Sequence, residues 1–158
     1  MCVMAARLAG AAEITVCDVH DRALALARQA GADRTVRSDQ VDVASLADSA
    51  DVTIEAAGSP AALHTCLTAV KRGGRVIQVG TLPAELPFPA NSVMQRELDY
   101  RGVFRAHLAF DWAVQAIRSR RVDVRPLITA QLPLSQSREA FELALDKTQS
   151  TKVQVVAA

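Results

Sequence analysis

The sequence lacks the features that mark membrane proteins, secreted disulfide-bonded proteins and redox or metal sites. Its longest apolar run near the N-terminus, Met1 to Ala6, is far shorter than the roughly 20 residues that a membrane span needs. The three cysteines, Cys2, Cys17 and Cys66, are odd in number and have neither metal-ligand nor redox spacing. We therefore expect reduced thiols, no membrane segment and a cytoplasmic location.

Charge of one sign is also lacking. Eighteen basic and seventeen acidic residues are spread along the chain and give a formal net charge of +1. This distribution excludes the electrostatic footprint of a nucleic-acid or anionic-membrane partner. With 158 residues, half of them hydrophobic, the chain can bury a core without disulfides or a structural metal.

Hydrophobic periodicity predicts helices alternating with short strands. The helices are expected over residues 1–9, 21–29, 60–72, 110–120 and 137–146, where Ser59 caps the third helix and Gly73-Gly74 ends it. The last helix is expected to point Phe141, Ala144 and Leu145 inward. The strands are expected over residues 13–17, 35–37, 51–55, 75–79, 98–104, 128–132 and 152–156.

This alternation is typical of right-handed crossovers and a mostly parallel sheet. The predicted fold class is α/β, a Rossmann-like doubly wound parallel sheet. The chain starts inside a helix, so the first strand of that fold is expected to be missing. Trp112 is interpreted as a packing residue.

Asp18 follows the first expected strand, where a dinucleotide-binding acid accepts hydrogen bonds from the adenosine ribose. The usual spacing places the glycine fingerprint just before Met1. The alternative is that Asp18 only caps the following turn. A carboxylate here favours NAD over NADP, and Arg22 beside it could stack on adenine or clamp a phosphate.

Gly58 and Gly80 each follow an apolar strand, at the edge where open α/β sheets bind ligands. They either let the backbone approach a cofactor or only allow a tight turn with positive φ. Arg105 follows a later strand and is the arginine expected in a cleft. His20, His64 and His107 share no ligand spacing, so neither catalytic nor metal-binding residues are predicted.

Several of these segments resemble the C-terminal part of zinc-dependent medium-chain dehydrogenases of the sorbitol and L-idonate type. The resemblance lies in Ala9 to Asp18, Ala30 to Asp33, Glu55 to Gly58, Val79 to Thr81 and Gly102 to Arg105. The tail, Asp146 to Gln149 and Lys152 to Val155, is most similar to the L-idonate 5-dehydrogenase branch. Ala106 stands where sorbitol enzymes often have tyrosine.

The resemblance implies an NAD-linked oxidation of a secondary alcohol in a sugar acid or polyol, of the L-idonate to 5-ketogluconate type, by a homodimer or homotetramer. It implies zinc whose ligands are absent from this chain, so the 158 residues alone are expected to be inactive. Residues 1–127 would form the NAD-binding domain, and residues 128–158 would return to the catalytic domain. The implied cofactor-binding residues are Asp18, Arg22, Ala57, Gly58, Val79, Gly80, Thr81, Phe104 and Arg105.

Two other classes remain open. A non-catalytic nucleotide-sensing or subunit-interaction module would use the exposed last strand, residues 152–156, to pair with another chain. A methyltransferase-type α/β domain shares the strand-end acid but does not explain the tail.

Overall fold

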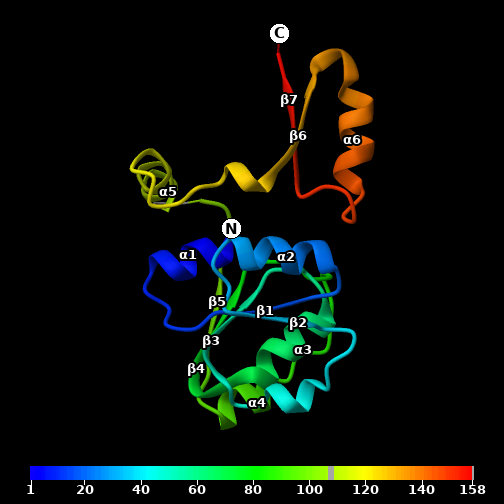
Figure 1. Ribbon diagram of the computed structural model, residues 1–158. Coiled ribbons are helices and arrows are strands. Elements are labelled where there is room, and N and C mark those ends of the chain that lie inside the picture. The colour runs from blue at the N-terminus through cyan, green and yellow to red at the C-terminus, as the bar shows by residue number, and fades with distance from the viewer. Residues whose placement is uncertain (107–108, 158) are drawn as a thin grey trace. The chain divides into compact units, whose positions relative to one another are not determined.

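The computed structural model describes residues 1–106 and 109–157, in which strands and helices alternate along the chain (Figure 1). The chain forms two compact units, one from residues 1–40 together with 109–157 and one from residues 41–106. None of the described helices is long and apolar enough to cross a membrane.

Residues 1–40 form a short parallel pair of strands with two helices. The elements are α1 (Cys2–Leu8), β1 (Thr15–Asp18), α2 (Asp21–Gln29) and β2 (Arg34–Arg37). The parallel register places Asp18 opposite Arg37 at the carboxyl ends of both strands. Helix α2 buries Leu24 and Ala27, and it ends before Gly31, whose φ of +104° needs a residue without a side chain.

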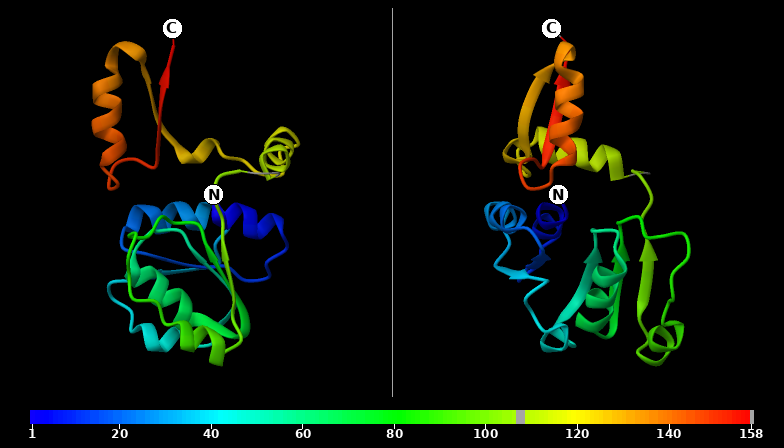
Figure 2. Two further views of the ribbon diagram at one scale, coloured as in Figure 1. Left: turned by 180° about the vertical axis from the view of Figure 1, so that it is seen from behind. Right: turned by 90° about the vertical axis from the view of Figure 1, so that its right-hand side faces the viewer.

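Residues 41–106 form a three-stranded parallel sheet with the order β3-β4-β5 (Figure 2). The elements are η1 (Val43–Leu46), β3 (Ala50–Glu55), α3 (Pro60–Ala69), β4 (Val70–Gln78), α4 (Ala90–Gln95) and β5 (Asp99–Gly102). The Ser59 hydroxyl accepts a hydrogen bond from the Ala62 N–H at 3.1 Å, which confirms the predicted cap of α3. Helix α3 packs on the sheet through a buried cluster of Leu63, Leu67, Val70 and Val76.

Residues 109–157 form a helix followed by a strand-helix-strand unit. The elements are α5 (Ala109–Arg118), η2 (Arg125–Leu127), β6 (Ile128–Pro133), η3 (Leu134–Gln136), α6 (Ser137–Leu145) and β7 (Lys152–Val156). Strands β6 and β7 are parallel, and α6 packs on both of them.

The strand pairings match two parts of the doubly wound order 3-2-1-4-5-6. The pair β2-β1 corresponds to strands 3 and 2, and β3-β4-β5 corresponds to strands 4, 5 and 6. No strand within the described ranges corresponds to strand 1. The strands β1 and β3 accordingly have one ladder each, and Val52 on β3 is 47% exposed.

The prediction that Gly73 and Gly74 cap α3 is wrong. The helix ends at Ala69, and Val70 is fully buried in an extended conformation that pairs with Ala50. Both glycines therefore lie inside β4, at an irregularity in its register with β3, where Gly73 has a φ of +70°.

Predicted burial also fails at several large apolar side chains. Phe141 and Leu145 are 71% and 79% exposed, because α6 turns the small residue Ala140 toward its strands. Trp112 is 71% exposed and is not a packing residue. The strand predicted over residues 98–104 ends at Gly102, which leaves Phe104 83% exposed.

Arg96 ties together the segments at the amino-terminal ends of the strands in residues 41–106. Its guanidinium donates to the carbonyls of Leu67, at 2.5 Å, and Val70, at the end of α3. It also forms an ion pair with Asp48 at 2.8 Å. One planar cation thus satisfies carbonyls that the helix end leaves without backbone partners.

We predict that Arg96→Met lowers the free energy of unfolding by about 2 kcal/mol, because buried carbonyls lose a charged donor. The matched control is Arg72→Met, since Arg72 is exposed and, among the described residues, donates only to the Gln95 carbonyl. Urea unfolding measures both variants. Equal midpoints for the two variants would contradict the assigned role of Arg96.

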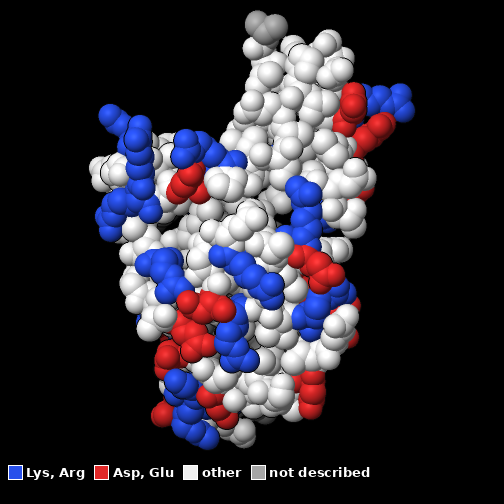
Figure 3. Space-filling view, viewed as in Figure 1, with Lys and Arg blue, Asp and Glu red and all other residues white. Residues whose placement is uncertain are grey.

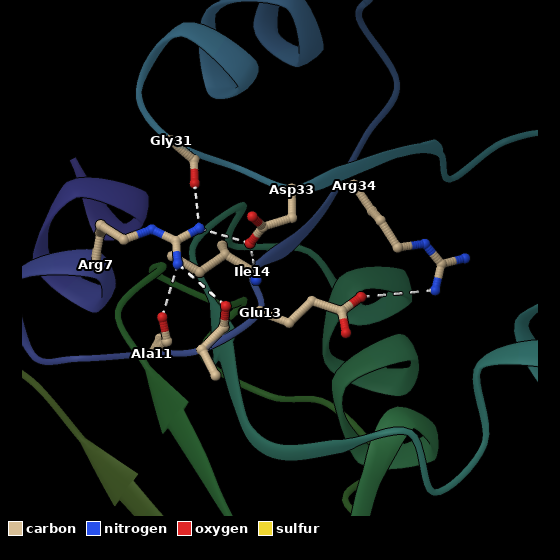
Figure 4. Close-up of polar contacts among 8 residues, drawn as sticks. Arg7, Ala11, Glu13, Ile14, Gly31, Asp33 and Arg34 are labelled. Carbon is tan, nitrogen blue, oxygen red and sulfur yellow. Dashed lines mark hydrogen bonds and ion pairs between the residues drawn. The ribbon is translucent and has the colours of Figure 1, made fainter.

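Arg7 and Asp33 hold the connection between α1 and β1 in place (Figure 4). The Arg7 guanidinium donates to the carbonyls of Ala11, at 2.8 Å, and Gly31, at 2.7 Å, and it pairs with Asp33 at 2.5 Å. Asp33 also accepts the Ile14 N–H at 2.7 Å. The Ile14 N–H and then the Arg7 guanidinium hold the pKa of Asp33 below its ordinary value.

Because the pKa of Asp33 is lower in the folded than in the unfolded chain, its contribution to stability is complete above its unfolded pKa. The contribution is lost as the pH falls from about 4 through the folded pKa. We expect Asp33→Asn to remove this part of the acid dependence, as measured by urea midpoints from neutral to acid pH. Glu85→Gln is the control, because the exposed Glu85 carboxylate makes neither hydrogen bonds nor ion pairs within the described chain. Identical pH profiles for wild type and Asp33→Asn would refute the prediction.

Candidate functional site

The carboxyl end of β1 places the half-buried Asp18 at the turn into α2. One oxygen of its carboxylate accepts the His20 N–H at 2.9 Å, which is the turn-capping interaction that the sequence left open. The described residues provide no other hydrogen-bond partner for this carboxylate. Capping therefore uses one oxygen and is compatible with a second, ligand-binding role for the other.

Arg22 lies in the first turn of α2 and is exposed, without an ion pair among the residues that the structure describes. Sequence reasoning missed Arg37, which faces Asp18 across the ladder. The Arg37 guanidinium lies 3.0 Å from Asp21 and 2.6 Å from Asp39, and it lowers the pKa of Asp39 through their hydrogen bond. Acidic and basic side chains likewise lie beside one another over much of the face in Figure 3.

The carboxyl end of β3 is built around Glu55, which is fully buried and was not among the predicted site residues. Its carboxylate accepts the N–H groups of Ala57, at 2.9 Å, and Gly58, at 2.7 Å. The resulting turn leaves Ala57 exposed and gives Gly58 a φ of +71°. The signal for Glu55 was present in the sequence, as a carboxylate that ends an apolar strand just before a small-residue turn.

The carboxyl end of β4 packs its turn directly against the turn that follows β3. The Val79 and Gly80 N–H groups donate to the Glu55 carbonyl at 2.8 and 3.0 Å. A Cβ on Gly80 would lie 2.3 Å from the Gly58 nitrogen, and a Cβ on Gly58 would lie 2.6 Å from the Thr81 carbonyl oxygen. Close packing of two turns thus requires both glycines, and Gly58 also requires its positive φ.

The carboxyl end of β5 leads into an exposed segment. The Val103 N–H donates to the Gln78 carbonyl at 2.9 Å, which ties this end to β4. Phe104 and Arg105 are exposed, and the Arg105 guanidinium lies over the Phe104 ring, 5.0 Å from its centroid. Arg105 has a φ of +58°, a backbone conformation that residues other than glycine rarely adopt.

Seven of the nine predicted cofactor-binding residues thus lie at the carboxyl ends of the parallel strands β3, β4 and β5 or just beyond them. They are Ala57, Gly58, Val79, Gly80, Thr81, Phe104 and Arg105. Asp18 and Arg22 belong to the other unit, at the end of β1. Open α/β sheets bind their ligands outside these carboxyl ends.

The residues present do not fit a zinc ion. Within residues 1–106 and 109–157, no three His, Cys, Asp or Glu side chains lie close enough to hold a metal. His107 lies outside the described residues, and His64 is exposed on α3. No chemical step is therefore assigned to zinc through this chain.

Comparison with known proteins adds the family. Residues 1–119 match the family described as zinc-binding dehydrogenase. The chain is 35% identical over 157 residues to L-idonate 5-dehydrogenase (NAD(P)(+)) of Escherichia coli (strain K12), covering 98% of this chain and 46% of that one. It is 33% identical over 150 residues to sorbitol dehydrogenase of Rattus norvegicus, covering 90% of this chain and 42% of the relative.

The fold agrees with a solved relative. The crystal structure of L-idonate 5-dehydrogenase from Escherichia coli str. K-12 substr. MG1655 superposes with a TM-score of 0.91 at 35% identity, over 98% of this chain and 46% of that one. The chain spans about half the length of the curated relatives it matches. Its fold is the Rossmann-like fold of these enzymes, and the chain belongs to the zinc-binding dehydrogenase family.

Proposed function

We propose that the chain is the cofactor-binding portion of an NAD-dependent zinc dehydrogenase that oxidises a secondary alcohol of a sugar acid or polyol. The cofactor, when bound, would accept a hydride from the alcohol carbon while the hydroxyl group loses a proton, which would leave a ketone. Zinc, bound outside these residues, would polarise the alkoxide. The similarity to L-idonate and sorbitol dehydrogenases supports this substrate class.

The observation that carries the proposal is the set of turns at the carboxyl ends of β3, β4 and β5. Their backbone is held by Glu55, and they leave Ala57, Val79 and Thr81 exposed at one edge of the sheet. Open α/β sheets bind their ligands at this edge. A nicotinamide ring needs both backbone hydrogen bonds and an apolar surface, and these turns offer the two together.

Asp18 and Arg37 favour NAD over NADP. The Asp18 carboxylate would accept hydrogen bonds from the adenosine ribose and repel a 2′-phosphate. Arg37, the cation opposite it, is neutralised by Asp21 and Asp39 and so is not available to a phosphate. Arg22 is the exposed arginine of this end and would lie beside the adenine.

Three further features belong to the same proposal. Residues 1–127 form the NAD-binding domain, and residues 128–158 return to the catalytic domain. The whole enzyme is a homodimer or homotetramer. We expect that the 158 residues alone do not oxidise L-idonate, because the family resemblance places the zinc ligands outside them.

We predict that Asp18→Asn weakens NAD binding about tenfold, since charge-assisted hydrogen bonds to the ribose become neutral ones. The asparagine oxygen can still accept the His20 N–H, so the turn is retained. Isothermal titration of the 158-residue chain with NAD and NADP measures the change. Asp42→Asn is the control, because Asp42 caps η1 through the Ala44 N–H.

The proposal would be overturned by a wild-type chain that binds NADP more tightly than NAD, or by unchanged NAD affinity in Asp18→Asn. Formation of NADH from L-idonate by the 158 residues alone would refute the assignment of the chemistry to residues outside this chain.

A further inference from the structure

Glu55 is the ionisable side chain that the described part of the chain buries completely. A carboxylate taken out of water needs full hydrogen-bonding compensation, and an apolar residue would fill the same place without that need. A completely buried carboxylate at a strand end, held by hydrogen bonds, therefore points to a role in fixing the conformation around it.

Glu55 binds the turns of two strands at once. Its carboxylate oxygen Oε1 accepts from the N–H groups of Ala57 and Gly58, and its backbone carbonyl accepts from those of Val79 and Gly80. The second carboxylate oxygen, Oε2, lies only 2.5 Å from the position that a Cβ on Gly80 would occupy. Neither turn can shift without breaking a hydrogen bond to this one residue.

Gln78 and Tyr100 orient the far side of the carboxylate. The Gln78 Nε2 donates to the Gly80 carbonyl at 2.6 Å and lies 3.5 Å from Glu55 Oε2. Because a carbonyl and a carboxylate can only accept, the Gln78 Nε2 faces them, and its Oε1 faces Tyr100 and accepts a hydrogen bond from the hydroxyl. Burial, and then the charge of Glu55, raises the pKa of Tyr100, which keeps this hydroxyl a donor.

The Tyr100 ring is itself fixed by packing. It meets Phe88 edge to face, with the ring centroids 5.2 Å apart. Phe88 belongs to the loop that follows Thr81, so the chain of contacts runs from this loop through Tyr100 on β5 and Gln78 on β4 to Glu55 on β3.

We propose that Glu55 is a positioning residue which, oriented by Gln78 and Tyr100, holds the Gly58 and Gly80 turns in the shape that receives the nicotinamide end of NAD. The inference rests on the proposed function. Strands β3, β4 and β5 correspond to the second mononucleotide-binding half of the doubly wound order, and the acid that binds the adenosine ribose belongs to the first half. A turn that is already ordered binds more tightly than one that must be ordered by its ligand.

Two substitutions test the role in the 158-residue chain. Tyr100→Phe removes only the hydroxyl and keeps the contact with Phe88. Glu55→Gln keeps the shape and an acceptor for Ala57 and Gly58, but it sets an amide donor against Gln78. Arg96→Met is the control, because it destabilises the same sheet at its opposite edge without touching these turns.

The first readout is amide hydrogen exchange by NMR, expressed as the exchange rate of Gly58 divided by that of Ile77 in the middle of β4. We expect this ratio to rise about tenfold in Tyr100→Phe and Glu55→Gln, because the turn opens locally. It should not rise in Arg96→Met, because loss of stability of the whole sheet raises the exchange of Ile77 at least as much as that of Gly58. An unchanged ratio in both turn variants, or an equal rise in the control, would overturn the positioning role.

The second readout is the affinity for NAD, measured from shifts of the Val79 to Thr81 amide signals. We expect roughly tenfold weaker binding in Tyr100→Phe and Glu55→Gln than in Arg96→Met. Equal affinity in all variants, despite a raised exchange ratio, would overturn the inference. A wild-type chain that does not bind NAD would overturn the proposed function of these turns, whereas the exchange ratio still decides whether Glu55 holds them.

Discussion

The turns at the carboxyl ends of β3 and β4 are held in place by the buried carboxylate and the backbone carbonyl of Glu55. Four N–H groups from two turns converge on this residue, two on its side chain and two on its carbonyl. A parallel sheet leaves backbone groups without partners where its strands end, and an unpaired buried group costs about 1–3 kcal/mol. Glu55 satisfies such groups internally, so the outer atoms of the turns remain available to a ligand. At the amino-terminal ends of the same strands, the Arg96 guanidinium donates hydrogen bonds to backbone carbonyls.

Within the described residues, strands β1 and β3 each have one hydrogen-bonded neighbour. An interior strand of a parallel sheet is normally covered on both faces and paired on both edges. Here β1 alternates exposed and half-buried residues, and Val52 on β3 is 47% exposed. Strand β1 is hydrogen-bonded to one neighbouring strand. The hydrogen bonds of Arg7 and Asp33 therefore help to hold the segment that leads into β1 in place.

Local patterns predicted local structure well. The bounds of α2 and β7 agree with the sequence, because apolar spacing and a following or preceding turn define both. The predictions failed where distant residues decide. The pairing of Val70 with Ala50 ends α3 before the two glycines, and the choice of Ala140 as the packing residue of α6 depends on its strands.

The same division applies to the candidate site. Sequence alone placed Gly58, Gly80 and Thr81 at strand ends, and the structure brings these residues into contact. Their close packing on each other was not predicted, since the sequence offered only cofactor approach or a positive φ as reasons for glycine. Glu55 and Arg37 were missed because part of their surroundings comes from neighbouring strands. The turn after β4 brings the Val79 and Gly80 N–H groups to Glu55, and β1 places Asp18 opposite Arg37. The roles of Gly58, Gly80 and Thr81 as NAD ligands stay predictions.

We propose that the turns after β3 and β4 receive a nicotinamide ring. Intermolecular nuclear Overhauser effects between NAD and the methyl groups of the 158-residue chain test it most directly. The account predicts contacts from the nicotinamide ring protons to the exposed methyl groups of Ala57, Val79 and Thr81. Contacts to the exposed methyl group of Ala47 near η1, at the opposite edge of the sheet, with none to these three residues, would contradict it.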